Sequence, residues 1–108
     1  MGESPKFSEK NTVLQDFSPI NFSRNDYFLD ATDRKLLLTY AGKMATMGCL
    51  RISLQGTRDA AKGGLPDIDL LRAKAVRNYL VSLYGQFKFN QIERLISDKR
   101  QVKITCTN

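Results

Sequence analysis

The sequence predicts an α+β domain, a two-layer sandwich in which two helices cover one face of a mixed four-stranded sheet. Two segments repeat their apolar residues with helical spacing, and four segments read as short strands. Their order is strand, helix, strand, helix, strand, strand, which favours this architecture. The chain has 108 residues, of which 42% are hydrophobic, enough for one core. We expect a tail or linker over residues 1–11 and one domain over residues 12–108.

The first strand and helix follow from a change of period. Ile20 and Phe22 alternate with polar residues, which predicts a strand over Ser18–Ser23. A helix is then predicted to start at Thr32, as N-cap, and to stop at Gly48. Its inner face is expected to contain five residues at spacings of three and four, namely Leu37, Leu38, Ala41, Met44 and Ala45.

The second strand and helix enclose a glycine-containing loop. Leu50, Ile52 and Leu54 alternate with polar residues, as in a strand with one buried face. The loop is expected over Gly56–Asp67, and Asp69 is predicted to cap a helix that runs to about Leu83, before Gly85. The inner face of this helix is expected to contain Leu70, Ala73, Val76, Leu80 and Leu83.

The last two strands are predicted over Gln91–Ser97 and Arg100–Thr107, joined as a hairpin by the turn at Asp98 and Lys99. The two cysteines occupy different strand phases. Cys49 is in phase with Arg51, whereas Cys106 is in phase with the apolar residues of its strand. We therefore expect two free thiols.

The composition argues against several classes of function. Histidine is absent and the two cysteines have no metal-ligand spacing, so we expect no metal site and no cofactor. No pairing of a nucleophile with a base can be proposed, so we expect a protein that is not an enzyme. No run reaches the ~18 apolar residues of a membrane helix, and the N-terminus lacks a secretory signal. An exported form would have an anchor that is removed or absent here, with Met1 and Gly2 as added residues.

The residues around the glycine-containing loop give the clearest indication of function. Asp59 follows the second strand, and Arg72 lies in the first turn of the second helix. A fixed anion and a fixed cation on opposite sides of a pocket suit a zwitterionic ligand, and an arginine can hold a carboxylate through two parallel hydrogen bonds. The same two residues could instead form an internal salt bridge that ties the strand to the helix.

This region resembles the OmpA C-terminal-like domains, which carry Gly-His-Thr-Asp after a strand and then a helix with Leu-Ser-x-x-Arg-Ala-x-x-Val-x-x-Tyr-Leu. The matching residues here are Gly56-Thr57-Arg58-Asp59 and a helix with Arg72-Ala73, Val76 and Tyr79-Leu80. The resemblance covers roughly residues 17–107. It implies that Asp59 binds the ammonium group and Arg72 a carboxylate of diaminopimelate in the peptidoglycan peptide stem, with Thr57 and Arg58 beside them.

The resemblance also implies a periplasmic, outer-membrane-associated protein such as a lipoprotein, with peptidoglycan as its partner. Thr57 replaces the motif histidine, Arg58 its threonine and Asp69 its serine, and the loop is about two residues shorter. The alternative is therefore a structural subunit of an envelope complex, such as a secretion system, that has lost peptidoglycan binding.

The net charge of +6 and a cluster of basic and aromatic residues are also compatible with nucleic-acid binding, a hypothesis that we do not favour. The cluster consists of Tyr84, Phe87, Lys88 and Phe89.

Overall fold

The computed structural model describes residues 13–49, 51–58 and 65–107, so the predicted tail over residues 1–11 lies outside them. Two helices and five strands form in the order β-α-β-α-β-β-β. They are β1 (Val13–Asn21), α2 (Ala31–Met47), β2 (Arg51–Arg58), α3 (Ile68–Leu83), β3 (Lys88–Phe89), β4 (Glu93–Ile96) and β5 (Gln101–Thr107).

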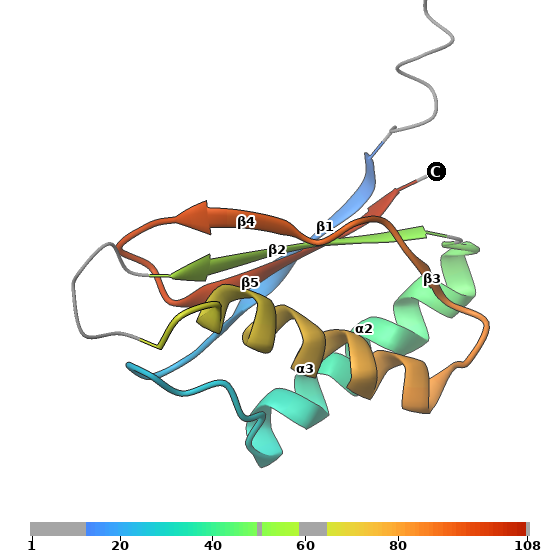
Figure 1. Cartoon of the computed structure of the whole chain (residues 1–108). Coiled ribbons are helices and arrows are strands. Elements are labelled where there is room, and N and C mark those ends of the chain that lie inside the picture. The colour runs from blue at the N-terminus through green and yellow to red at the C-terminus, as the bar shows by residue number, and fades with distance from the viewer. Residues whose placement is uncertain (1–12, 50, 59–64, 108) are drawn as a thin grey trace, which may run out of the picture.

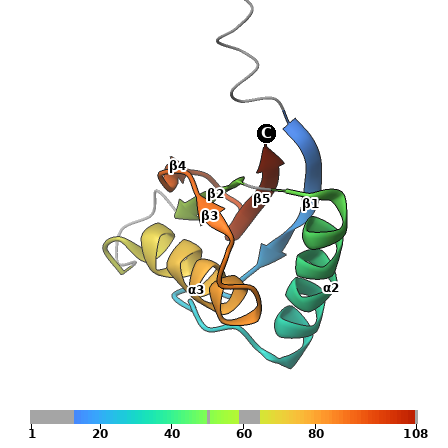
Figure 2. The same ribbon diagram turned by 90° about the vertical axis from the view of Figure 1, so that its right-hand side faces the viewer.

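The predicted α+β sandwich is confirmed, with α2 and α3 side by side on one face of a mixed sheet (Figures 1 and 2). The strand order is β1-β5-β2-β3, and β4 also pairs with β2. The sheet has five strands rather than four because β3, which was not predicted, precedes β4, the strand that corresponds to the predicted third strand over Gln91–Ser97. β3 pairs with Arg51 and Ile52, β4 pairs with Gln55–Arg58 along the same edge, and Asn90 between them donates its backbone N–H to the Ile52 carbonyl.

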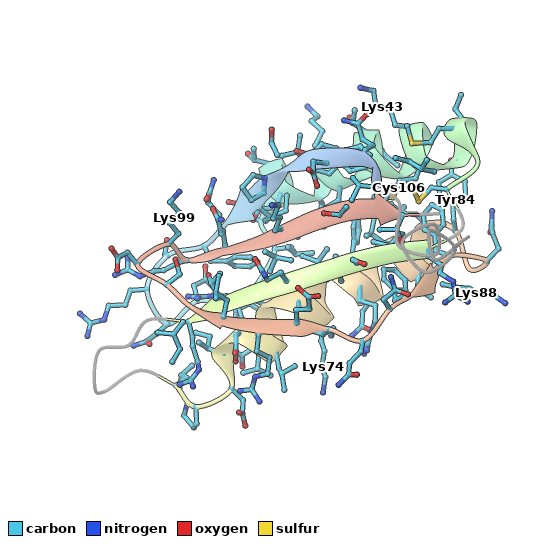
Figure 3. All side chains as sticks on the ribbon, turned by 90° about the horizontal axis from the view of Figure 1, so that it is seen from above. Lys43, Lys74, Tyr84, Lys88, Lys99 and Cys106 are labelled. Carbon is cyan, nitrogen blue, oxygen red and sulfur yellow. A yellow bond between two sulfur atoms is a disulfide. The ribbon has the colours of Figure 1, made fainter. Side chains whose placement is uncertain are left out.

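The predicted hairpin of the last two strands is wrong. β4 runs parallel to β2, whereas β5 runs antiparallel to β2 on its other side, so β2 separates them. Figure 3 looks onto the open face of the sheet and shows β2 between these two strands. The polar residues 97–100 therefore cross the end of β2 instead of forming a two-residue turn, and the Ser97 N–H bonds to the Arg58 carbonyl.

β1 is longer than predicted and begins at Val13 rather than at Ser18. Its pairing with β5 shifts register between Phe17 and Ile20, where Pro19 has no N–H to donate. Phe17 and Ile20 nevertheless both point into the core. The irregular pairing is the reason why simple alternation identified only the second half of this strand.

The first helix begins slightly earlier than predicted. Asp30, not Thr32, is its N-cap, and Asp30 and Asp33 bond to each other's backbone N–H as a capping box. The predicted end at Gly48 is confirmed by the left-handed φ of 74°. The inner face is shifted toward Tyr40, which is buried, while the predicted Leu38 is 51% exposed. The Tyr40 hydroxyl donates to the Ser18 carbonyl, which removes the cost of burying it.

The prediction of two free thiols is wrong, because Cys49 and Cys106 form a disulfide with a Cα–Cα distance of 5.9 Å. Cys49 is not part of the strand. Its N–H still bonds to the carbonyl of Met44 at the end of α2, and β2 begins only at Arg51. Strand phase therefore does not apply to Cys49. The disulfide, at the labelled Cys106 in Figure 3, fastens the end of α2 to the central strand β5.

The core lies between the helices and the inner face of the sheet, and the predicted site residues Thr57, Arg58 and Arg72 lie at its edge, where β2 ends and α3 begins. Its fully covered aliphatic residues come from both helices and three strands, namely Ile20, Leu37, Met44, Ile52, Leu54, Val76, Leu80, Val102 and Ile104.

Candidate functional site

Arg72 is a buried charged side chain of this region, with 1% of its surface exposed. Its Nε donates to the Asp26 carbonyl at 2.8 Å, its Nη2 to the Ser23 carbonyl at 3.0 Å and its Nη1 to the Thr57 carbonyl at 3.1 Å. The guanidinium carbon also lies 5.4 Å from the ring centroid of Phe22. Arg72 thus joins α3 to the end of β2 and to the segment after β1, and these bonds offset the cost of burying its charge.

Thr57 is buried as well, at 1% exposure, and its hydroxyl is used within the fold. The oxygen accepts the Gln101 N–H at 2.9 Å, and the carbonyls of Lys99 and Gln101 lie within hydrogen-bonding distance of the hydroxyl. Because a hydroxyl carries one proton, it donates to one of these carbonyls at a time. The side chain of Thr57 therefore fixes the start of β5 against the end of β2, and its carbonyl holds Arg72.

Asp69 does not cap the second helix, contrary to the prediction. The N-cap position is Asp67, which has a φ of 61° and makes no side-chain capping bond. The Asp69 carboxylate is completely buried and accepts from Arg94 Nε at 2.9 Å and Arg94 Nη2 at 3.0 Å. Arg58 Nε lies 3.7 Å from the same carboxylate. Asp69 therefore ties α3 to β4 and to the end of β2, as a buried acid requires charged partners.

Gly56 permits this close packing of α3 on β2. A Cβ at Gly56 would lie 2.2 Å from the backbone oxygen of Asp69 and 2.9 Å from its carbonyl carbon. Backbone atoms cannot move away as the end of a flexible side chain can. The glycine of the motif is thus required by the approach of the first turn of α3.

The charged partners of Asp69 control its ionisation. Burial by itself would raise the pKa of Asp69, but the hydrogen bonds from Arg94 and from the Leu70 N–H, together with the charges of Arg94 and Arg58, outweigh burial and lower it. The bonds to Asp69 and Asp67 in turn raise the pKa of Arg94. Both directions favour the ionised forms of Asp69 and Arg94.

The structure brings three of the four predicted site residues to one end of β2. Arg72 contacts the backbone of Thr57, Arg58 turns toward Asp69, and Asp59 lies outside the described residues. Arg94 was missed. Its signal was the alternation of Ile92, Arg94 and Ile96, which gives this arginine the strand phase of two isoleucines.

Further features of the described residues concern a hollow on the sheet, groups of metal ligands and membrane-spanning helices. A hollow lined by Ser53, Gln55, Glu93, Lys103 and Thr105 lies on the open face of the sheet and contains none of the predicted site residues. Within the described ranges, no group of three or more acidic or cysteine side chains could hold a metal ion. No helix in the described part of the chain is long and apolar enough to cross a membrane.

No protein-family model matches the chain, and no curated protein matches it. Solved structures do. An outer membrane protein from Borrelia burgdorferi has a TM-score of 0.63 at 22% identity, and the match covers 84% of this chain and 86% of that one. The OmpA-like domain of FopA1 from Francisella tularensis has a TM-score of 0.62 at 12% identity, with 95% and 84% covered.

A third similar structure is the peptidoglycan-associated lipoprotein from Burkholderia pseudomallei, with a TM-score of 0.61 at 21% identity and coverage of 81% of this chain and 87% of that one. All three are similar to this chain over most of its length, in agreement with the resemblance seen in the segment from Gly56 to Leu80. The chain therefore has the fold of the OmpA-like domains.

Proposed function

We propose that this chain is a non-catalytic domain that binds the peptide stem of peptidoglycan and so anchors an envelope protein to the cell wall. The observation that carries the proposal is the position of Arg72, in the first turn of α3 against the carbonyl of Thr57 at the end of β2. One protein of similar fold is a peptidoglycan-associated lipoprotein, and another is an outer membrane protein. Both names agree with such a role.

Diaminopimelate is the part of the stem that suits this place. Its side chain ends in an ammonium and a carboxylate on one carbon, so it needs an anion and a cation close together. Arg72 supplies the cation, and Asp59, the second residue after Thr57, supplies the anion. The carboxylate of the ligand would replace the carbonyls of Ser23 and Asp26 on the guanidinium, because a charged acceptor forms the stronger hydrogen bond.

We place the protein in the periplasm, associated with the outer membrane through an anchor outside the described residues. The Cys49–Cys106 disulfide supports an oxidising compartment, because disulfides persist in the periplasm and are rare in the cytosol.

Retention on purified sacculi tests the proposal. The Asp59→Ala variant should lose retention while it keeps the melting temperature of the wild type. Arg72→Ala removes three hydrogen bonds and is expected to destabilise the fold, so Arg72→Lys, which keeps the charge but loses the planar fork, is the second variant. Arg77→Ala is the control, since the hydrogen bonds of the Arg77 side chain to described side chains go to Asn78 alone. Equal retention of wild type and Asp59→Ala would reject the site.

A second candidate function is a structural subunit of an envelope complex such as a secretion system. The burial of Arg72 favours it, because the guanidinium already holds carbonyls of Ser23, Asp26 and Thr57 within the fold. This candidate requires that the wild type is not retained on sacculi and that a pull-down from solubilised membranes recovers a defined envelope partner. Retention that depends on Asp59 would exclude it.

A further inference from the structure

Arg58 and Arg94 form an arginine pair next to the proposed stem-binding residues. Arg94 Nε lies 2.9 Å and Arg58 Nε 3.7 Å from the same Asp69 oxygen, so the two guanidinium groups must be neighbours. The Asp69 side chain is 0% exposed, whereas those of Arg58 and Arg94 are 41% and 42% exposed. The buried carboxylate of Asp69 therefore fixes the positions of two half-exposed guanidinium groups, those of Arg58 and Arg94.

Both arginines have N–H groups that are not used in hydrogen bonds to described residues. Arg94 uses Nε and Nη2 for Asp69 and Asp67. Among the residues that the structure describes, none accepts a hydrogen bond from Arg94 Nη1 or from the two Nη groups of Arg58. A guanidinium whose position is already fixed loses less side-chain entropy on binding an anion.

We propose that Arg58 and Arg94 form a second anion subsite that binds a carboxylate of the peptide stem other than those of diaminopimelate. The inference rests on the proposed function and deepens it. Arg58 directly precedes Asp59 in the chain, so the subsite borders the position proposed for diaminopimelate. Arg58 occupies the place of the motif threonine, and the arginine pair is thus a feature of this sequence.

Asp67 is the residue that opposes this binding. Its carboxylate, 64% exposed, accepts from Arg94 Nη2 at 2.6 Å and would repel an incoming anion. An exposed ion pair contributes little to stability, so Asp67 can be replaced at small cost. Asp67→Asn should therefore strengthen binding of the anionic ligand, which a purely structural arginine pair would not produce.

Calorimetric titration with two peptides tests the subsite. One is a diaminopimelate-containing stem peptide with all carboxylates free, and the other has every carboxylate except those of diaminopimelate converted to an amide. Arg58→Gln should weaken binding of the free peptide about tenfold, the loss of one charged hydrogen-bonded contact, and leave binding of the amidated peptide unchanged. Arg94→Lys, which keeps a charge beside Asp69, should show the same selectivity, and Arg77→Gln should match the wild type for both peptides.

Equal affinities of wild type and Arg58→Gln for the free peptide would overturn the subsite, as would an equal loss for both peptides. If the wild type binds neither peptide, the proposed function fails, and titration with succinate followed by the Nε signals of the arginines then decides the subsite. Shifts at Arg58 and Arg94 that grow in Asp67→Asn would support it. No shift, or a shift with inorganic phosphate alone, would overturn it.

Discussion

Gly56 is the point at which β2 and α3 approach most closely, and it gives the sharpest test at the level of one residue. Gly56→Ala places a methyl group against the backbone of Asp69, so α3 must move. We expect a loss of about 1–3 kcal/mol in the free energy of unfolding, measured by urea denaturation. Gly42→Ala is the control, since a Cβ there meets no atom within 4 Å and should stabilise α2 by about 0.5–1 kcal/mol. Equal stability of the two variants would contradict the packing.

Asp69 should make stability depend on pH. Its pKa in the folded protein is lowered, so its ionised form stabilises the fold at any pH above the ordinary carboxyl value of about 4. That contribution is lost as pH falls through the lowered folded pKa. In urea denaturation at a series of pH values, wild type should therefore lose its advantage over Asp69→Asn below about pH 4. Asp98→Asn, in the exposed connection to β5, is the control; an Asp69→Asn curve parallel to that of wild type would contradict the assignment.

At the scale of elements, the capping box of α2 can be tested separately from the core. Asp30 accepts from the N–H of Asp33 at 2.8 Å, so Asp30→Ala should cost about 1 kcal/mol. Thr32→Ala should change stability by less than about 0.5 kcal/mol, because Thr32 is an exposed residue within the first turn. Thermal unfolding followed by circular dichroism compares the two. The reverse order would restore Thr32 as the cap.

Elements set by neighbouring residues could be predicted from the sequence. The alternation of Ile52 and Leu54 identified β2, and Gly48 marked the end of α2, because both depend on local geometry. Partners distant in the chain could not be predicted in this way. A short edge strand gives the same pattern whether it pairs in parallel or as a hairpin, and the polar turn at Asp98 suited both. The partnership of Asp69 with Arg94 is equally a product of tertiary packing, and it overrides the usual role of an aspartate as a helix cap.

At the scale of the whole molecule, the disulfide should make a large contribution to the free energy of unfolding. It joins cysteines 57 positions apart, at the end of α2 and in β5, for which chain entropy predicts a contribution of about 4 kcal/mol. The Cys49→Ser/Cys106→Ser variant should unfold at a correspondingly lower urea concentration, and dithiothreitol should shift wild type to the same midpoint. Mass spectrometry after alkylation under denaturing conditions should find neither cysteine alkylated in the oxidised protein, because both sulfur atoms are part of the disulfide. Two alkylated cysteines there would contradict the bridge.

The position of β5 between β1 and β2 has a consequence for how the protein comes to be folded. β1 and β2 never pair with each other, so until β5 is in place β1 has no sheet to join. A nascent chain that has emerged only as far as β4 can form its helices and the short parallel contacts of β2, but not the layer against which those helices pack. Assembly should therefore be late and cooperative, with few stable partial structures along the way.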